Sequence, residues 1–361
     1  MDSKVILAKA GSGKTYYICN NFDCDKRVLI ISFTHDNLEN IRRELRYRFN
    51  GRIPNNIDVS TYDSFLYNHL LRPIEPFSKF KNFSSRGVDV KSKVISDGRD
   101  KAYIKDKFVR HYVNINNQYY VTRMAKFFLK ENGSFKRIAL RRLKKYFDII
   151  FIDEFQDFAG NDFKLINYLL SNLKIKVVAV GDLYQSNVTP VRVDGRGSSY
   201  PYNKVNNVSD FREYISKNIE IDTETLNKSR RLSVEVCNLI TKYMNIDILS
   251  YDMHSSDIIW LDDNYEISKV MKDKNITKLI YNKGNINNFG INFKTWSYSK
   301  GDTYDSACVI LTNKANDPNA WNKLPTSTRN KLYVALTRAK YNVYILRNDI
   351  YKKWKSENGI D

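Results

Sequence analysis

A glycine-rich turn directly after a short apolar run most constrains how this chain can fold. Val5–Ala8 is apolar, and Lys9 leads into Ala10, Gly11, Ser12, Gly13, Lys14 and Thr15. A buried parallel strand that enters such a turn and then a helix gathers backbone N–H groups at the helix N-terminus, where they bind phosphate. The pattern therefore predicts a phosphate-binding loop (P-loop) over residues 8–15, with Ala10, Gly11, Ser12, Gly13, Lys14 and Thr15 as the nucleotide contacts.

The last two residues of this loop have the chemistry that a nucleoside triphosphate needs. We expect Lys14 to hold the β- and γ-phosphates of ATP and the Thr15 hydroxyl to bind Mg²⁺. The general pattern begins with Gly, whereas Ala8 stands at that position here. An ordinary strand–helix turn is the alternative, and the Gly-Lys-Thr order favours the P-loop.

A second motif is an apolar run that ends in carboxylates. Ile149–Ile152 is followed by Asp153, Glu154, Phe155, Gln156 and Asp157. Ligands of open parallel sheets bind at the carboxyl ends of the strands. We expect Asp153 to hold Mg²⁺ and Glu154 to orient and deprotonate the attacking water. An acidic turn without function is the alternative, and the upstream P-loop makes the catalytic interpretation the better one.

Short apolar runs alternate with helical patterns over most of the chain. This alternation predicts an α/β fold with parallel sheets and two domains, the first interrupted by an insertion. The expected strands lie at 5–8, 28–32, 58–61, 148–152 and 175–180, and then at 219–225, 258–261, 278–281, 293–297, 307–311 and 342–346.

Positive charge is concentrated in one part of the chain. The 361 residues include 59 Lys or Arg and 40 Asp or Glu, a net charge of +19. Residues 73–145 hold 19 Lys or Arg and 6 Asp or Glu, and are therefore responsible for 13 of the 19 net charges. A general lysine bias would spread the charge evenly, so we expect this mainly helical segment to contact nucleic acid. A solvated basic helix face remains the alternative for Arg137, Arg141, Arg142, Lys144 and Lys145.

Several classes of protein are disfavoured by composition. No apolar run approaches the roughly 18 residues that cross a bilayer, and the first residues do not resemble a secretory signal. The four cysteines form no Cys-x-x-Cys pair, which argues against a zinc ribbon and a disulfide framework. We therefore expect no membrane association and a location in the cytoplasm, of a bacterial or phage-infected cell.

Eight motifs, in order, resemble those of the UvrD/Rep-type superfamily 1 DNA helicases. Beyond the P-loop and the Asp-Glu-x-Gln-Asp motif, the similarity includes a Gly-Asp-x-x-Gln-Ser motif and a C-terminal Tyr-Val-Ala-Leu-Thr-Arg-Ala-Lys segment. The eight lie at residues 8–15, 32–35, 60–65, 153–157, 180–186, 226–233, 295–305 and 333–340.

The resemblance implies two RecA-like P-loop NTPase domains. The first is expected at residues 1–72 and 146–200, the basic insertion at 73–145 and the second domain at 201–361. The large insertion that this family carries in its second domain is missing, so the chain resembles a short form.

The resemblance also assigns roles to residues far from the P-loop. Gln185 would sense the γ-phosphate, Gly301 would contact ATP, and Arg231 and Arg338 would reach the γ-phosphate from the second domain. Arg230 remains an alternative to Arg231. Single-stranded DNA would contact side chains inside or beside the motifs, although core packing is the alternative for each aromatic one: Thr34, Tyr62, Phe65, Tyr184, Trp296 and Tyr298.

The function implied is an ATP-dependent DNA helicase or single-stranded DNA translocase, moving 3′ to 5′, with a role in DNA repair. A second hypothesis is a DNA-stimulated ATPase that serves as motor or sensor for a separate nuclease, in phage defence or recombination. A third is a clamp on nucleic acid without catalysis, which the intact motifs disfavour.

The expected ligands are ATP, Mg²⁺ and single-stranded or partly duplex DNA, with RNA not excluded and a nuclease or repair protein as a possible partner. Arg230 stands where the family tends to stack Tyr on adenine, and no upstream adenine-reading Gln precedes the first strand, so we expect relaxed nucleotide specificity.

Overall fold

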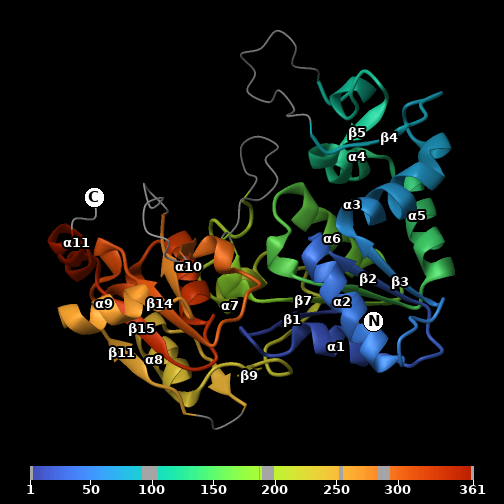
Figure 1. The fold of residues 1–361 in the computed structure, drawn as a ribbon. Coiled ribbons are helices and arrows are strands. Elements are labelled where there is room, and N and C mark those ends of the chain that lie inside the picture. Colours follow the sequence, from blue (N-terminus) through green and yellow to red (C-terminus); the bar gives the residue numbers. More distant parts are fainter. Residues whose placement is uncertain are drawn as a thin grey trace. The chain divides into compact units, whose positions relative to one another are not determined.

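A computed structural model describes residues 3–91, 105–186, 188, 199–251, 255–282 and 293–358. The chain falls into two compact units, and each is described by itself below (Figure 1). The first unit comprises Met1–Ile6, Lys14–Gly181 and Pro190–Asp222. The second comprises Leu7–Gly13, Asp182–Thr189 and Thr223–Asp361, so two short segments that precede Thr223 in the sequence also belong to it. The domain borders expected from the sequence stay a prediction.

The first unit is built on a six-stranded sheet with the order β3-β2-β6-β7-β1-β8. The pairs β2–β3, β2–β6, β6–β7 and β1–β8 are parallel. Burial on both faces of such a sheet explains why its central strands are continuous apolar runs. The strands are β1 (Lys4–Leu7), β2 (Val28–Ser32), β3 (Ile57–Thr61), β6 (Ile149–Ile152), β7 (Lys176–Gly181) and β8 (Glu220–Asp222).

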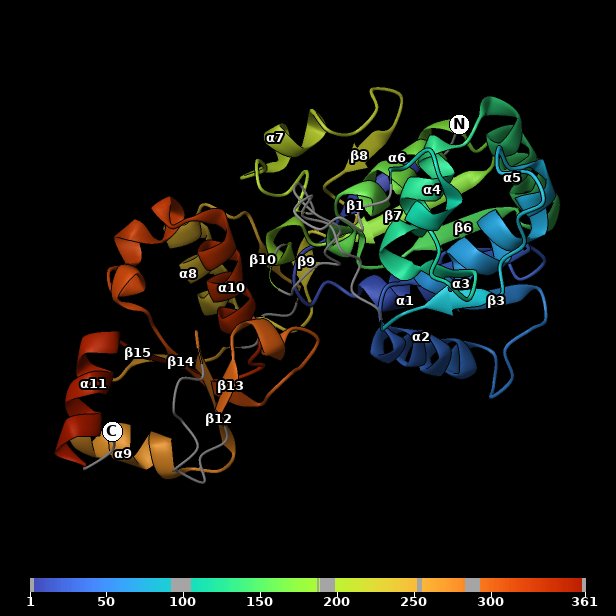
Figure 2. The same ribbon diagram turned by 90° about the horizontal axis from the view of Figure 1, so that it is seen from above.

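Helices cover both faces of this sheet. The helices α1 (Lys14–Asn20) and α2 (His35–Arg48) lie on one face, and α6 (Asn161–Asn172) lies on the other (Figures 1 and 2). This placement follows from right-handed crossovers, because β1 to β2 and β2 to β3 run one way along the sheet and β6 to β7 runs back. The P-loop strand β1 and the acidic strand β6 flank β7, so their carboxyl ends lie at one edge.

The α/β class with parallel sheets, expected from the sequence, is confirmed. The run 219–225, which lies inside the expected second domain at 201–361, contributes strand β8, and this strand pairs with β1 in the first sheet. The ion pair between Lys4 Nζ and Asp222 Oδ2, at 2.6 Å, lies across this pairing.

The described part of the basic insertion is helical at its C-terminal end. The short helix α3 (Tyr62–Phe65) precedes it, and α4 (Met124–Lys130) and α5 (Gly133–Tyr146) lead back to β6. Two short parallel strands, β4 (Gly87–Asp89) and β5 (Gln118–Tyr120), were not expected from the sequence. Residues 92–104 of the insertion lie outside the described residues. A cluster of buried aromatic rings forms the interior: Tyr112, Tyr119, Phe127, Phe128 and Phe135.

The second unit contains a five-stranded sheet with the order β11-β15-β14-β12-β13. All four pairings in this sheet are parallel. Its strands are β11 (Ile258–Trp260), β12 (Ile276–Ile280), β13 (Phe293–Thr295), β14 (Ser306–Ile310) and β15 (Val343–Leu346).

Helices of the second unit pack its interior around large aromatic side chains. Trp296, Trp321 and Tyr333 are fully buried there. The helices α8 (Val234–Met244) and α10 (Thr326–Leu336) contribute to one core cluster. The helices α9 (Asn264–Lys272) and α11 (Asn348–Glu357) were not expected from the sequence.

The remaining elements are α7 (Val208–Arg212) in the first unit and a two-stranded sheet of β9 (Lys228–Ser229) and β10 (Leu249–Ser250) in the second. Among the described residues, no helix is long and apolar enough to cross a bilayer.

Candidate nucleotide-binding site

Asp153 follows β6 at the carboxyl edge of the first sheet and is only 2% exposed. Its backbone N–H donates to the Ile31 carbonyl at 2.8 Å, and the Ser32 hydroxyl donates to its Oδ2 at 3.5 Å. Its other carboxylate oxygen, Oδ1, is buried and has no hydrogen-bond partner among the described residues. Burial and the charge of Glu154 raise the pKa of Asp153. A buried carboxylate oxygen without a donor fits a divalent cation, which would also keep the group ionised.

Glu154 is held in a strained backbone conformation between two polar neighbours. Its φ and ψ of 51° and 48° lie in the left-handed region, at a cost of about 1–2 kcal/mol for such a residue. Its Oε1 lies 3.7 Å from Lys14 Nζ, and the side-chain amide of Gln156 donates to its Oε2. The expected phosphate-binding lysine and the expected general base are therefore neighbours in the first unit. Thr15 follows Lys14 in α1.

Gly181, the last residue of β7, allows the turn after β6 to lie close to the sheet. A Cβ added to Gly181 would lie 2.5 Å from Gln156 Oε1 and 2.9 Å from the Phe155 nitrogen. Any larger residue would displace the turn that begins with Asp153 and Glu154. Gly181 therefore positions the acidic motif.

The P-loop segment Leu7–Gly13 makes its hydrogen bonds within the second unit. The Lys9 N–H donates to the Leu226 carbonyl and the Arg230 N–H donates to the Gly11 carbonyl, both at 2.9 Å. The Ala10 N–H donates to the Tyr333 hydroxyl at 3.1 Å.

This segment has one position that only glycine can occupy and one unpartnered hydroxyl, and the hydroxyl suits a phosphate ligand. Gly11 has a φ of +74°, and an added Cβ would lie 2.7 Å from Ser229 Oγ and 2.8 Å from Arg231 Cβ, so only glycine fits. The Ser12 hydroxyl is buried without a hydrogen-bond partner among the described residues.

The two arginines expected at the γ-phosphate are neighbours in the second unit. Arg338 is 2% exposed, and its Nη1 donates to the Asp302 carbonyl at 3.2 Å. Arg231 Nη1 donates to Thr303 Oγ1 at 3.2 Å, and its Nε is buried without a partner among the described residues. Burial and the charge of Arg338 lower the pKa of Arg231 to about 9. The segment that both arginines contact follows Gly301, which is exposed with a φ of +91°.

The structure also separates the two candidates for the first arginine. Arg230 extends over the ring of Tyr251, with 4.3 Å from its Cζ to the ring centroid. Arg231 instead lies near Arg338, and burial together with the charge of Arg338 lowers the pKa of Arg231. The choice of Arg231 for the γ-phosphate stays a prediction.

A buried polar network surrounds Gln185 and includes residues that have no role predicted from the sequence. Gln185 Nε2 donates to Asp182 Oδ2 at 2.8 Å, and the Tyr333 hydroxyl donates to the same oxygen at 3.1 Å. Asn330 Nδ2 donates to the Ser186 carbonyl at 3.0 Å. Asp182 and Tyr333 both lie inside motifs recognised from the sequence, and that position was the available signal for them.

Three of the aromatic candidates for DNA contact are core side chains in this structure. Tyr62, Phe65 and Trp296 are 0% exposed. The Tyr62 hydroxyl donates to Asp162 Oδ1 at 3.0 Å, and Trp296 Nε1 donates to the Leu279 carbonyl at 3.1 Å. A base cannot stack on these rings, because protein atoms cover them. All three side chains therefore pack in the core, which was the alternative to DNA contact for each of them.

The other candidates differ in exposure. Tyr184 is 7% exposed and lies under the Lys9 ammonium, 4.9 Å from its ring centroid. Tyr298 is 75% exposed and open to solvent. Thr34 is exposed, and its hydroxyl accepts a hydrogen bond from the Asn37 N–H at the start of α2. Tyr298 and Thr34 are therefore the sequence-predicted contacts that a nucleic acid can reach.

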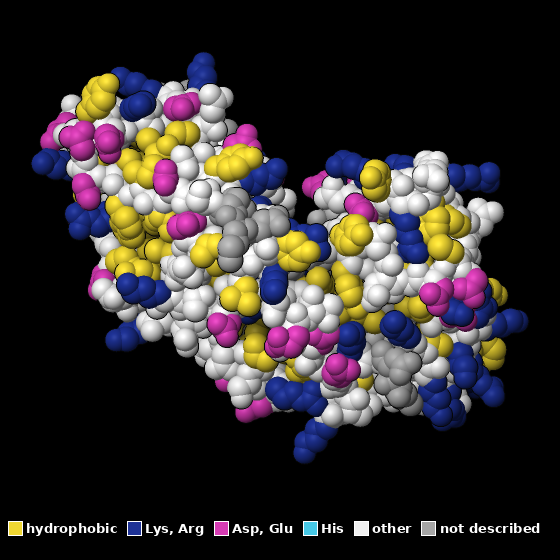
Figure 3. Space-filling view, turned by 90° about the horizontal axis from the view of Figure 1, so that it is seen from below, with side chains coloured by type: hydrophobic (Ala, Val, Ile, Leu, Met, Phe, Trp, Pro, Cys, Tyr) yellow, Lys and Arg dark blue, Asp and Glu magenta, His cyan; other side chains and the backbone are white. Residues whose placement is uncertain are grey.

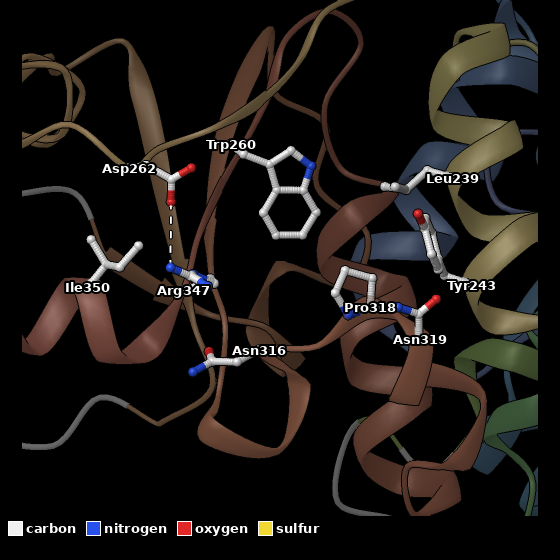
Figure 4. A pocket seen from close by; sticks show the side chains of 9 residues that line it. All are labelled: Leu239, Tyr243, Trp260, Asp262, Asn316, Pro318, Asn319, Arg347 and Ile350. Carbon is white, nitrogen blue, oxygen red and sulfur yellow. Dashed lines mark ion pairs between the residues drawn. The ribbon is translucent and has the colours of Figure 1, made fainter.

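A cavity of about 620 Å³ in the second unit contains none of these residues (Figure 4). Tyr243 and Trp260 line it, and Asp262 and Arg347 form an ion pair at 3.8 Å on its wall. We assign no role to it.

Comparisons with known proteins agree with the motif pattern. Residues 211–347 match the family described as the viral superfamily 1 RNA helicase core domain. The Gabija protein GajB of Bacillus cereus (strain VD045) is 28% identical over 274 residues, which cover 71% of this chain and 52% of the relative. These sequence matches relate the chain to superfamily 1 helicases. The chain thus spans about half the length of the curated relative that it matches.

Solved structures of arterivirus nonstructural protein 10, a helicase, also resemble the chain. One crystal structure has a TM-score of 0.49 and 16% identity, and covers 98% of this chain and 61% of the viral one. A complex of that viral helicase with DNA has a TM-score of 0.48 and 16% identity, with coverages of 98% and 62%.

Proposed function

We propose that this protein is an ATP-dependent DNA helicase or single-stranded DNA translocase of the UvrD/Rep type, moving 3′ to 5′. The observation that carries the proposal is the pair of neighbouring cations Arg231 and Arg338 in the unit that also holds Gly11. The pKa of Arg231 is lowered by burial and by Arg338, which means that the site favours a bound anion. The triphosphate of ATP supplies that negative charge.

Each side chain then has a role in phosphoryl transfer. Lys14 holds the β- and γ-phosphates, and Glu154 orients the attacking water and accepts its proton. Arg231 and Arg338 stabilise charge on the γ-phosphate, and Gln185 responds to its presence. Mg²⁺ held by Thr15 and Asp153 would neutralise phosphate charge, and the unpartnered Oδ1 of Asp153 fits that role.

Nucleic acid movement follows if hydrolysis takes place between the two RecA-like domains predicted from the sequence. Both domains would hold the γ-phosphate before hydrolysis and release it afterwards, so each cycle would change the relative position of two nucleic-acid contacts. Thr34 and Tyr298 are exposed candidates for these contacts. We place the protein in the cytoplasm of a bacterial or phage-infected cell.

The test is ATP turnover with and without a short single-stranded oligonucleotide, for the natural protein and for Glu154→Gln. We expect the strand to stimulate turnover, and the substitution to lower it by about 10²–10⁴-fold while nucleic-acid binding is retained. Glu213→Gln, at an exposed glutamate, is the matched control and should turn over normally. Undiminished turnover by Glu154→Gln would show that another group is the base.

A second candidate is a DNA-stimulated ATPase that acts as motor or sensor with a separate nuclease or repair protein. It is favoured by the sequence, which lacks the large insertion that the UvrD/Rep-type family carries in its second domain. Strand displacement by this chain alone would support the helicase and count against the second function, because a motor or sensor subunit does not require it.

A further inference from the structure

The helix α5 carries a row of cations on its exposed face. Phe135, Ala139 and Leu143 are buried on the opposite face. The exposed side chains recur at intervals of three, four and eight residues, so they form one stripe along the helix. The α5 stripe consists of Arg137, Arg141, Lys144 and Lys145.

The charges of the α5 stripe are not neutralised by the described residues. Arg141, Lys144 and Lys145 have no side-chain hydrogen bond or ion pair there, and Arg137 donates only to Ser134 Oγ at 2.9 Å. The helix itself, Gly133–Tyr146, contains no Asp or Glu. Like charges four residues apart destabilise a helix by a few tenths of a kcal/mol, which a bound polyanion would reverse.

This arrangement differs from the general positive charge of the surface. Figure 3 shows Lys and Arg side chains interspersed with acidic and apolar ones over the face drawn. Net charge alone therefore does not select a binding surface. A row of cations whose own helix carries no acidic residue is a more specific sign of a binding surface.

A cavity of about 960 Å³ lies at the C-terminal end of α5. Its walls come from α5 and from residues at the amino ends of β2, β3 and β6. Parallel strands have their amino ends at one edge, so this cavity is at the edge of the first sheet opposite to Asp153. It is therefore separate from the nucleotide site. Its lining includes Arg142, Tyr146, Phe147, Asn55 and Asn56.

The cavity combines an aromatic ring and an amide with an arginine that has no ion pair among the described residues. The Arg142 guanidinium lies 4.6 Å from the centroid of the Tyr146 ring, and Arg142 Nε is buried without a partner among the described residues. Tyr146 is 49% exposed. The Tyr146 ring and the exposed side chain of Asn55 suit a nucleobase, which offers a flat face and polar edges. The Asn56 amide already donates to the Cys24 and Lys26 carbonyls.

Of the acidic groups near the cavity, Asp148 is paired with an arginine. Asp58 Oδ2 lies 3.4 Å from His69 Nε2, which forms an ion pair with it only when the imidazole is protonated. Asp148 accepts two side-chain hydrogen bonds from Arg27, at 3.0 and 2.6 Å. Arg27 also donates to the Lys145 carbonyl at 2.5 Å, which fixes the end of α5 beside the cavity. The region as a whole keeps an excess of positive charge.

We infer that the α5 stripe and this cavity form a second contact for single-stranded nucleic acid. Phosphates would lie along Arg137, Arg141 and Lys145, whose neighbouring positions are about 5–6 Å apart, and a base would enter the cavity against Tyr146. The inference rests on the proposed function for the presence of a strand. An acidic protein surface would match the stripe, but it would make less use of the aromatic and amide lining.

The experiment measures the salt dependence of binding to a labelled oligo-dT of about 20 nucleotides, longer than a single contact site. Arg141→Glu/Lys145→Glu is compared with Lys314→Glu/Lys352→Glu, which changes net charge equally at exposed lysines that have no ion pair among the described residues. We expect the α5 variant to reduce the slope of log K against log salt by about 1.4, since each lost phosphate contact is worth about 0.7. The control should keep the natural slope.

A second measurement uses the natural protein and therefore does not depend on the folding of a variant. Irradiation of its complex with an iodouracil-substituted strand should cross-link the peptide that contains Tyr146. An unchanged slope together with no cross-link at Tyr146 overturns the inference and favours an acidic protein as the ligand of the stripe. Failure of the proposed function is different, because the natural protein would then show no strand-stimulated ATP turnover at all.

Discussion

The hydroxyl of Tyr333 donates a 3.1 Å hydrogen bond to Oδ2 of Asp182 in the interior of the second unit. The same hydroxyl accepts the Ala10 N–H, also at 3.1 Å. One side chain near the C-terminal end of the chain thus links a P-loop amide to the buried carboxylate that also holds Gln185. If a phosphate accepted the Ala10 N–H, the hydrogen bond from Ala10 to Tyr333 would be lost. The Tyr333 hydroxyl would then keep only its hydrogen bond to Asp182.

Tyr333→Phe should lower the free energy of unfolding by about 1–3 kcal/mol. The substitution keeps the ring and removes the hydroxyl, which leaves the buried Ala10 N–H without its acceptor and Asp182 with one donor fewer. Urea denaturation measures the change. Tyr341→Phe, at a tyrosine that is 54% exposed, is the control and should leave stability unaltered. A Tyr333→Phe variant as stable as that control would mean that water replaces the hydroxyl at no cost.

Gly181→Ala should destabilise the first unit and impair ATP turnover together. Its Cβ would lie 2.5 Å from Gln156 Oε1 and 2.9 Å from the Phe155 nitrogen, so the turn carrying Glu154 must move. We expect a loss of about 1–3 kcal/mol in unfolding free energy. Gly133→Ala is the control, because there only the flexible end of Arg137 lies nearby, at 3.4 Å. That helix position should gain up to about 1 kcal/mol. Equal effects at both glycines would contradict the packing argument.

The sequence predicted what depends on local pattern. The strands before Lys14 and Asp153 were expected from their apolar runs, and the structure brings the Lys14 ammonium within 3.7 Å of Glu154. Parallel strands with their carboxyl ends at one edge make such neighbours predictable from two distant motifs.

Features that depend on distant packing were not predictable. The partner of β8 is β1, more than 200 residues away, and no periodicity reveals that pairing. The burial of Tyr62 and Trp296 likewise depends on what packs over them. An aromatic residue inside a motif has the same sequence pattern whether it faces a base or the core, so only the structure separates Tyr298 from Trp296.

Asp153→Asn should abolish the effect of Mg²⁺ on nucleotide binding. Oδ1 of Asp153 is buried without a donor, and an amide in its place removes the negative charge that a divalent cation requires. Titration with a fluorescent ATP analogue, in Mg²⁺ and then in EDTA, gives two affinities for each protein. We expect them to differ for the natural chain and to coincide for the variant. Asp162→Asn, at another buried aspartate of the first unit, should preserve the difference. A persistent Mg²⁺ effect in Asp153→Asn would place the cation elsewhere.

The ion pair between Arg27 and Asp148 should be measurable in an acid titration. Hydrogen bonds from Arg27 lower the pKa of Asp148 to about 2. Because the folded pKa lies below the unfolded value of about 3.9, the pair stabilises the fold above that value and loses its contribution as pH falls through about 2. Arg27→Gln should return the pKa of Asp148 toward about 4, as followed by carboxyl ¹³C chemical shifts. A midpoint still near 2 in that variant would assign the shift to the Arg27 backbone N–H.

The position of Arg230 predicts weak discrimination between ATP and GTP. Its N–H is bonded to the Gly11 carbonyl, so the residue begins beside the P-loop, and its guanidinium lies over Tyr251 at 4.3 Å. A guanidinium plane stacks on any base through its π face and does not read the base edges that distinguish adenine from guanine. Turnover numbers and KM for the two nucleotides should therefore agree within about tenfold, that is, within about 1.4 kcal/mol of transition-state binding. Arg230→Ala should raise both KM values in parallel, and Lys228→Ala, at an exposed neighbour, should change neither. A preference of several hundredfold for ATP would require donors and acceptors aimed at the adenine edge, and would rule out stacking on Arg230 as the main base contact.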